Sequence, residues 1–138
     1  MTTARQLMTR GVDCVGEGDT LLQAAEMMRQ LGVGAMPICG HDDRLKGMLT
    51  DRDIVVKALG AGKDPASTTA GDLAQGEVVY VDADDDAQLV LRRMSAHKVR
   101  RLPVIEDHRL VGMIAQADVA RALPHPQVGD LLTALSTD

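Results

Sequence analysis

The chain has 138 residues, one tyrosine, no phenylalanine or tryptophan, and a formal net charge of −5 at pH 7. This length can form one compact domain, or two small halves of about 60 residues that must pack together to bury enough apolar surface. The acidic balance and the near absence of aromatic rings argue against nucleic acid as a partner. No apolar run approaches the ~18 residues of a membrane span, so we expect no membrane association.

In chain order, the first half predicts a short helix opened by Thr3 and a strand at 12–15. A longer helix follows Thr20 and ends at Gly32, with an apolar face of Leu21, Leu22, Ala24, Ala25, Met28 and Leu31. Strands at 36–39 and 45–49 predict a hairpin, and Thr50 then caps a helix that runs to Leu59.

The second half repeats this order. It predicts a strand at 78–81, a helix over 87–97, a hairpin of strands at 102–105 and 110–114, and a helix over 116–123. Gly129 opens a last short helix. Each half thus reads β-α-β-β-α, and the fold class we expect is α/β (α+β).

The two halves are also similar residue by residue. Ala35-Met36-Pro37-Ile38 returns 66 residues later as Arg101-Leu102-Pro103-Val104, and the segment from Arg44 to Asp53 returns as Arg109 to Asp118. Such a repeat predicts a pseudo-symmetric pair that buries a shared face. We expect repeat 1 at residues 3–60, a linker at 61–68, repeat 2 at 69–124, and a short helix and tail at 125–138.

The most informative motif is the segment from Gly47 to Asp53. Gly47 permits close approach of another backbone within a strand. Thr50 can cap the following helix while Asp53, three residues later, completes a capping box. A helix start of this kind suits a phosphate, and a carboxylate one turn in suits the hydroxyls of a ribose. The alternative is that Thr50 and Asp53 form a capping box and nothing more.

Several paired features together resemble a tandem pair of CBS domains, also called a Bateman module. They are the strands around Pro37 and Pro103, the two Gly-to-Asp segments, and the phrase His-Lys-Val-Arg-Arg-Leu-Pro-Val at 97–104. The resemblance covers nearly the whole chain, from about Thr3 to Leu123. More narrowly, the chain is similar to the stand-alone hypoxic response proteins of that family.

The resemblance implies a sensor with two clefts between the repeats, which take adenosine-type ligands such as AMP, ATP or S-adenosylmethionine. It also implies a homodimer in which two pairs stack as a disc. Carried over, Thr50 helps to hold phosphate and Asp53 holds ribose. The ligand-binding residues we expect are Met36, Pro37, Gly47, Met48, Thr50, Arg52, Asp53, Arg100, Arg101, Pro103 and Asp118.

The second segment departs from this pattern, because Ala115 stands where a threonine or serine is expected. The loss of a capping hydroxyl costs about 1 kcal/mol, and a phosphate loses a hydrogen bond as well. Arg100 and Arg101 can compensate, since guanidinium groups bind phosphate through two hydrogen bonds. The alternative is that both arginines pair with Asp82, Asp84 or Asp107. We therefore expect the two clefts to behave differently.

Cys14 and Cys39 both lie in the first half, and their repeat equivalents are Tyr80 and Ile105. We expect two buried thiols that act as small apolar side chains. The alternative is a disulfide, because both lie near the ends of consecutive strands that we expect to be parallel and about 4.8 Å apart.

His41 and His108 occupy equivalent turns beside aspartates. They could take an adventitious transition metal, but the spacing supports no built site, and we favour solvated turn histidines.

Two functions remain after an enzyme is set aside, because the chain has no nucleophile elbow, P-loop or dinucleotide-binding motif. The first is a regulatory sensor whose ligand changes the packing of the repeats or the dimer. The alternative is an interaction protein with ligand-free clefts that acts through protein partners, in a stress or hypoxia response. The N-terminus lacks the layout of a signal peptide, so we expect a cytoplasmic protein; export without a signal peptide leaves no mark in a sequence.

Overall fold

The computed structural model describes residues 2–74, 78–123 and 125–136. The chain forms two compact units. Unit 2 is continuous, from Asp13 to Val78, whereas unit 1 combines residues 1–12 with residues 79–138. Each unit is described by itself below.

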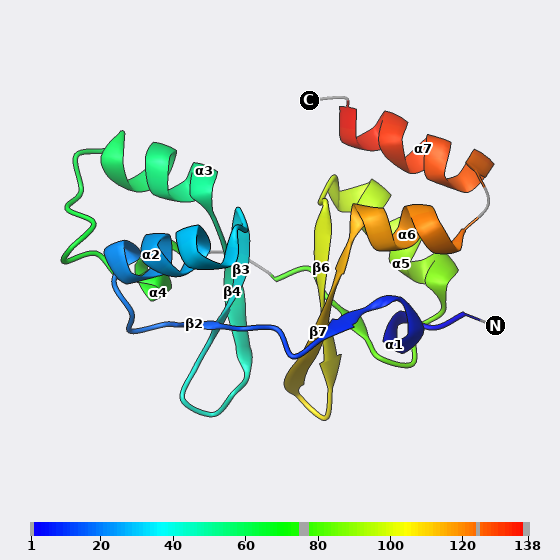
Figure 1. The fold of residues 1–138 in the computed structure, drawn as a ribbon, viewed down its shortest axis with the longest axis horizontal. Helices are drawn as coiled ribbons and strands as arrows, with labels where there is room; N and C mark the ends of the chain where they lie inside the picture. Colours follow the sequence, from blue (N-terminus) through cyan, green and yellow to red (C-terminus); the bar gives the residue numbers. More distant parts are fainter. Residues whose placement is uncertain (1, 75–77, 124, 137–138) are drawn as a thin grey trace. The chain divides into compact units, whose positions relative to one another are not determined.

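Unit 2 is a three-stranded sheet covered on one face by helices (Figure 1). Its strands are β2 (Val15–Gly16), β3 (Ala35–Cys39) and β4 (Leu45–Thr50), in the order β2-β3-β4, with β2 parallel and β4 antiparallel to β3. Its helices are α2 (Leu21–Leu31), α3 (Asp51–Asp53), η1 (Ile54–Leu59) and α4 (Ala70–Leu73).

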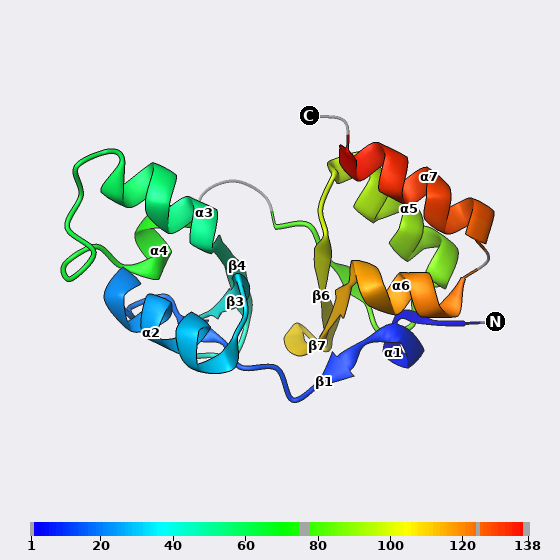
Figure 2. The same cartoon turned by 45° about the horizontal axis from the view of Figure 1, so that its top comes forward.

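Unit 1 has the same plan with additions. Its sheet has the order β1-β7-β6-β5, formed by β1 (Thr9–Arg10), β7 (Arg109–Ala115), β6 (Arg101–Glu106) and β5 (Val81–Asp82). Its helices are α1 (Ala4–Leu7), α5 (Ala87–His97), α6 (Gln116–Ala122) and α7 (His125–Ser136). Figure 2 shows α7 lying over α5 and α6. Both units confirm the β-α-β-β-α pattern.

The ends of α2 follow from its capping residues. Thr20 Oγ1 accepts from the N–H of Gln23 at 3.1 Å, and Gln23 Oε1 accepts from the N–H of Thr20 at 2.9 Å. Gly32 ends the helix at φ 68°, a left-handed conformation that glycine adopts without a steric penalty. These are the start and stop signals expected from the sequence.

The first helix of each sequence repeat packs on the other repeat. The N–H of Ala4 in α1 donates to the C=O of Asp85 at 2.8 Å, and the N–H of Ala70 in α4 donates to the C=O of Asp19 at 2.8 Å. Leu7 and Leu73, the equivalent leucines, are 6% and 8% exposed. Each compact unit is therefore completed by a helix that belongs, by sequence, to the other repeat.

Two glycines leave space for the first helices, α1 and α4, which are exchanged between the two repeats in this way. A Cβ on Gly47 would lie 2.9 Å from Ala74 Cβ, just after α4, and a Cβ on Gly112 would lie 2.8 Å from the C=O of Thr9, just after α1. The close approach expected at Gly47 is thus an approach by the end of α4.

Each unit has its own aliphatic core. The core of unit 2 consists of Val15, Leu21, Ala24, Met28, Met36, Ile38, Leu49, Ile54, Ala58, Ala70 and Leu73. The core of unit 1 consists of Ala4, Leu7, Val81, Ala83, Ala87, Val90, Leu91, Met94, Leu102, Val104, Ile114, Val119, Leu131 and Leu135.

Some local expectations were wrong. The strand expected at 12–15 is β2 at Val15–Gly16, and the strand expected at 78–81 is β5 at Val81–Asp82. The last helix is longer than expected, because it begins at His125. Leu22 and Leu31, placed on the apolar face of α2, are 48% and 47% exposed.

The helix expected after Thr50 changes its hydrogen bonding after one turn. Residues Ile54–Leu59 form a π-helix, and the N–H of Gly60 reaches back five residues to the C=O of Val55 at 2.7 Å. π-Helical turns are rare and are frequently found at functional sites.

The segment expected as a linker at 61–68 is held against the start of α2. The N–H of Leu21 donates to the C=O of Thr68 at 2.9 Å, and the N–H of Leu22 donates to the C=O of Pro65 at 3.1 Å. None of the helices in the described part of the chain is both long and apolar enough to cross a membrane.

Candidate functional site

The Thr50–Asp53 segment forms the expected capping box where β4 passes into α3. Thr50 Oγ1 accepts from the N–H of Asp53, and Asp53 Oδ2 accepts from the N–H of Thr50, both at 3.0 Å. The second carboxylate oxygen of Asp53 faces Lys57 Nζ at 3.2 Å, and the Asp53 side chain remains 22% exposed. The carboxylate is thus held in one orientation with its Oδ1 toward an exposed lysine.

The other residues expected around this segment divide into two groups. Pro37 lies opposite Met48 in the β3–β4 register, next to the pair formed by Ala35 and Thr50. Arg52 is exposed on α3. Met36, in contrast, is 2% exposed and belongs to the core of unit 2.

The second segment retains half of the capping box despite Ala115. Asp118 Oδ2 accepts from the N–H of Ala115 at 2.7 Å, and Asp118 Oδ1 accepts from Arg121 Nη2 at 2.5 Å. The Asp118 side chain is only 11% exposed. Both of its oxygens therefore have protein partners, and little of the carboxylate faces solvent.

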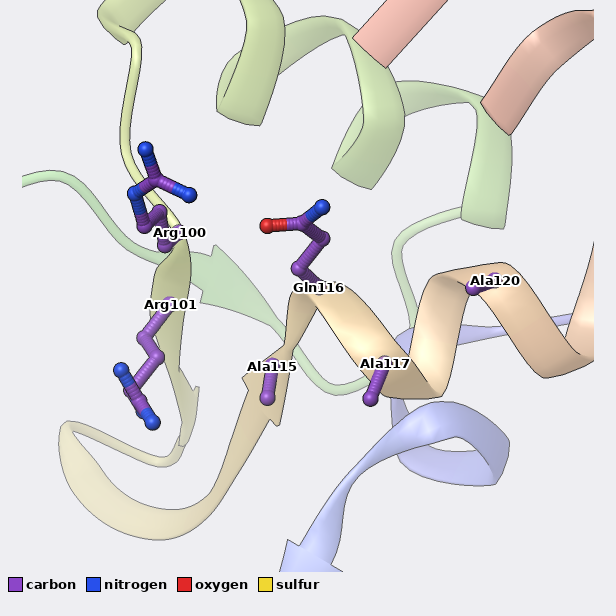
Figure 3. A pocket seen from close by; sticks show the side chains of 6 residues that line it. All are labelled: Arg100, Arg101, Ala115, Gln116, Ala117 and Ala120. Carbon is purple, nitrogen blue, oxygen red and sulfur yellow. The ribbon is translucent and has the colours of Figure 1, made fainter. Parts of the chain in front are cut away.

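A pocket of about 360 Å³ lies beside this second segment, where β6 begins and β7 passes into α6 (Figure 3). The N–H of Gln116 donates to the C=O of Arg100 at 3.0 Å, and Arg101 lies opposite Ala115 in the β6–β7 register. The lining residues are Arg100, Arg101, Ala115, Gln116, Ala117 and Ala120. Asp118 and Pro103 do not line it, and Pro103 is buried opposite Met113.

The ion pairs weighed for these two arginines are not formed. Within residues 2–74, 78–123 and 125–136, neither Arg100 nor Arg101 contacts a carboxylate, and Asp84 pairs instead with Arg5 at 3.1 Å. Gln116, Ala117 and Ala120 were not expected at a site. A comparison of the two repeats position by position could have identified them, because repeat 1 has Asp51, Arg52 and Val55 there.

Arg5, on α1, forms ion pairs with other parts of unit 1, one of them with Asp84. It also pairs with Glu106, and this hydrogen bond holds the pKa of the Glu106 carboxyl below its usual range. The same contacts raise the pKa of the Arg5 guanidinium. The sequence motifs gave no sign of this pairing, because the two residues lie 101 positions apart.

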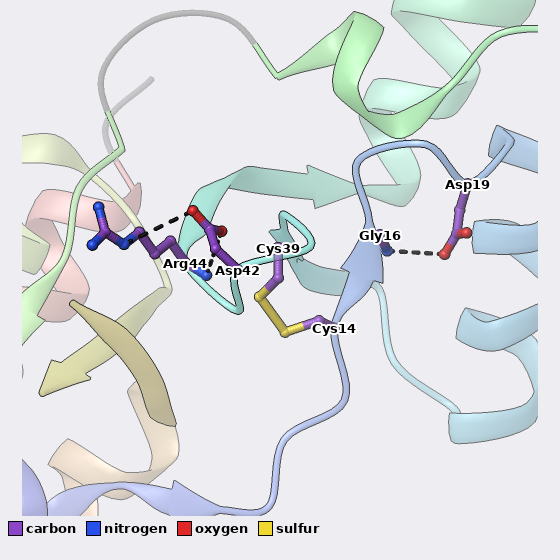
Figure 4. The surroundings of a disulfide bond; sticks show 6 residues. All are labelled: Cys14, Gly16, Asp19, Cys39, Asp42 and Arg44. Atoms are coloured by element: carbon purple, nitrogen blue, oxygen red, sulfur yellow. Dashed lines mark hydrogen bonds and ion pairs between the residues drawn. A yellow bond between two sulfur atoms is a disulfide. The ribbon is translucent and has the colours of Figure 1, made fainter. Parts of the chain in front are cut away.

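Cys14 and Cys39 form a disulfide, with Cα atoms 5.8 Å apart (Figure 4). The preferred expectation of two separate thiols was wrong. The alternative, a disulfide, is the one that the structure contains. The reason is the parallel pairing of β2 with β3, which places Gly16 opposite Cys39 and brings the preceding Cys14 within reach.

His41 and His108 are both exposed, each in the turn of its own hairpin. Within the part of the chain that the structure describes, no three His, Cys, Asp or Glu residues are grouped so that they could hold a metal ion. Both histidines are thus exposed turn residues.

Comparison with known proteins bears on this geometry. A model of the CBS domain family matches residues 4–60 and 70–125. The chain is 55% identical to Hypoxic response protein 1 of Mycobacterium tuberculosis over 98% of its length and 94% of that protein.

Two solved structures are also similar. A crystal structure of Hypoxic Response Protein I with two coordinated zinc ions has a TM-score of 0.84 at 58% identity, over 89% of this chain and all of that one. A crystal structure of CBSX2 in complex with AMP has a TM-score of 0.76 at 23% identity, over 88% of this chain and 96% of that one. The sequence repeat, the two similar units and these matches together show that the chain belongs to the CBS domain family, as a protein with two CBS domains in tandem.

Proposed function

We propose that this protein is a non-catalytic regulatory CBS pair that binds an adenosine-type ligand through the Thr50–Asp53 segment. The observation that carries the proposal is the Asp53 carboxylate, which is fixed by the capping box yet 22% exposed. CBSX2, which has the same fold, binds AMP.

The contacts at Thr50 and Asp53 are compatible with a ligand. Thr50 Oγ1 uses an acceptor lone pair for the N–H of Asp53, so its hydroxyl hydrogen is free to donate to a phosphate oxygen. Lys57, which faces Asp53 Oδ1, is 60% exposed. Exposed pairs of this kind are worth about 0–1 kcal/mol, so ribose hydroxyls can replace the lysine at little cost.

The first test is thermal unfolding with AMP, ADP, ATP and S-adenosylmethionine. A ligand at 100 times its dissociation constant should stabilise the protein by about 2.7 kcal/mol, which is a rise of several degrees in Tm. Asp53→Ala should abolish that rise.

The matched control is Asp72→Ala. Asp72 closes the same type of capping box at α4, where its Oδ2 accepts from the N–H of Thr69 at 2.9 Å. Both variants lose a cap, which costs about 1 kcal/mol, but only Asp53→Ala should lose the response to ligand. An equal response in Asp53→Ala and in the wild type would remove this segment from the proposal.

The second candidate is an interaction protein with ligand-free clefts that acts through protein partners. The observation that favours it is a set of exposed apolar side chains on α2 and η1. Val55, Val56 and Leu59 of η1 are 57%, 51% and 53% exposed. The residues of repeat 2 equivalent to Val55 and Val56 are Ala120 and Arg121. Apolar side chains grouped on an exposed helix commonly mark a contact with another protein.

We expect Val55→Asp together with Leu59→Asp to convert a homodimer into a monomer, measured by sedimentation velocity. A charge placed in an apolar contact is left desolvated and unpaired, which separates the subunits. Leu132→Asp, on α7 in unit 1, changes a leucine that is 43% exposed and should leave the assembly unchanged. If both variants sediment as the wild type does, η1 is not the dimer contact.

The proposed function does not involve a bound zinc ion. Hypoxic Response Protein I was crystallised with two coordinated zinc ions. In this chain the described residues contain no group of three or more metal-ligating side chains, and both cysteines are joined in the disulfide. The residues that the structure describes therefore do not offer a fitting zinc site within one chain.

A further inference from the structure

We propose that the Cys14–Cys39 disulfide is a redox switch that controls the docking of α4 on unit 2. While the bond is closed, α4 packs on the segment that precedes α2, and reduction of the bond by a dithiol releases α4. All of the contacts involved lie within unit 2, so the switch does not depend on the proposed ligand.

The segment on which α4 docks consists of residues 17–19, between β2 and α2, and we call it the docking segment. The N–H of Ala70 donates to the C=O of Asp19 at 2.8 Å. The N–H of Gly71 donates to the C=O of Glu17 at 2.9 Å. A helix of four residues is too short to be stable alone in water, so α4 depends on this docking.

The disulfide anchors the docking segment to the sheet. β2, directly before that segment, has two residues, and the N–H of Glu17 donates to the C=O of Cys39 at 3.0 Å. Cys14 lies just before β2 and Cys39 ends β3, so the bond between them closes the same junction covalently (Figure 4). With the bond open, the two-residue strand and this hydrogen bond remain to hold the docking segment to β3.

Unit 1 docks α1 through an equivalent backbone hydrogen bond but holds it in place differently. The N–H of Ala4 donates to the C=O of Asp85 at 2.8 Å, just before α5. Arg5 of α1 then pairs with Asp84 in the same segment and with Glu106 at the end of β6. One guanidinium group thus joins the helix, the segment on which it docks and the strand beside it.

Unit 2 replaces this cluster of charges with glycines. The equivalents of Arg5, Asp84 and Glu106 are, in that order, Gly71, Gly18 and Gly40. A Cβ on Gly71 would lie 2.8 Å from the backbone oxygen of Glu17, so a side chain does not fit there. Unit 2 has the cysteine pair instead, where unit 1 has Tyr80 and Ile105. The two docked helices therefore depend on different chemistry, charge for α1 and a disulfide for α4.

Reduction is a thiol–disulfide exchange that a dithiol can complete. Cys14 is partly exposed and Cys39 is 6% exposed, so a thiolate of the dithiol attacks Cys14 Sγ. The S–S bond breaks, and Cys39 leaves as a thiolate that takes up a proton. The second thiol of the reagent loses its proton and displaces Cys14 Sγ, which is protonated in turn. The protein gains two thiols, and the dithiol becomes a disulfide.

Release of α4 changes the surface of unit 2. While α4 is docked, Ala70 and Leu73 belong to the core of unit 2, and the end of α4 packs on β4 at Gly47. The reduced form therefore exposes apolar surface that the oxidised form covers. A local change at a disulfide that shifts a small packed element in this way is a common basis of redox sensing.

The test is amide hydrogen exchange, followed by NMR, on the full chain before and after reduction with dithiothreitol. Because reduction releases α4, the amides of Ala70 and Gly71 should exchange about tenfold faster or more. The amide of Met28, within α2, should accelerate much less, and those of Ala4 and Arg5 should not change. Reoxidation should restore the original rates.

Arg5→Ala is the matched control, because it removes the ion pairs that hold α1 in unit 1. It should accelerate exchange at Ala4 in oxidised and reduced protein alike, and it should leave Ala70 as in the wild type. In the Cys14→Ser, Cys39→Ser double variant, Ala70 should exchange as in the reduced wild type, and dithiothreitol should have no effect.

Unchanged exchange at Ala70 after reduction would mean that α4 does not depend on the bond. Equal acceleration at Ala70 and Met28 would mean uniform loosening of unit 2. Either result would overturn the proposal, and so would an effect of dithiothreitol on the double variant. These experiments contain no nucleotide, so a failed redox switch and a failed response to AMP are distinguishable.

Discussion

Leu7→Ala is expected to destabilise unit 1 by about 2–5 kcal/mol, the usual cost of removing a buried leucine side chain and leaving a cavity. Leu7 is 6% exposed and lies in the core of unit 1 with residues of repeat 2, although by sequence it belongs to repeat 1. Hydrogen exchange followed by mass spectrometry should therefore show loss of protection over residues 79–123.

The equivalent substitution Leu73→Ala provides the matched control. Leu73 is 8% exposed and lies in the core of unit 2, so its loss should act on residues 15–73. The two variants make the same chemical change at equivalent repeat positions, and only the exchange of the first helices gives them opposite targets. If Leu7→Ala loosened residues 15–73 and left 79–123 protected, the exchange would be contradicted.

Loss of the Cys14–Cys39 disulfide is expected to destabilise unit 2 by about 2–4 kcal/mol. The bond closes a loop with a sequence separation of 25 and holds the segment before β2 against the end of β3. β2 has only two residues, so it has few ladder hydrogen bonds of its own. Removing the cross-link should thus increase exchange first at the amides around Val15.

The measurement compares oxidised protein, protein reduced by a dithiol, and the Cys14→Ser, Cys39→Ser double variant. Unit 1 has Tyr80 and Ile105 at the equivalent positions and should keep its protection in all three samples. The reductant should also have no effect on the double variant. Unchanged melting of reduced protein and wild-type exchange in the double variant would show that unit 2 does not depend on the bond.

The elements with strong local signals could be predicted from the sequence. The caps at Thr20 and Gly32, the hairpins around the two prolines, and the capping box of Thr50 with Asp53 are all set by residues within a few positions of each other. The β-α-β-β-α order followed directly from those signals.

The features that depend on distant partners could not be predicted. β1 exists because Thr9 pairs with Met113, more than a hundred residues later. The sequence assigns one first helix to each repeat, but it does not show on which of the two similar units that helix packs.

The candidate site also combines local features, which could be predicted, with contacts between distant residues, which could not. Thr50 and Asp53 are close in sequence, so their hydrogen bonds could be foreseen. The pocket of Arg100 required knowledge that β6 begins beside the start of α6, and that Asp118 is held by Arg121 instead of facing a cavity.

The central claim is that the Thr50–Asp53 segment binds an adenosine-type ligand through the Asp53 carboxylate. The most direct test is calorimetric titration of AMP into the wild type, Asp53→Ala and Asp72→Ala, since both variants lose the carboxylate of a capping box. We predict that the wild type and Asp72→Ala bind AMP with the same affinity and heat, and that Asp53→Ala gives no AMP signal. Binding of AMP to Asp53→Ala with the affinity of the wild type would contradict the account.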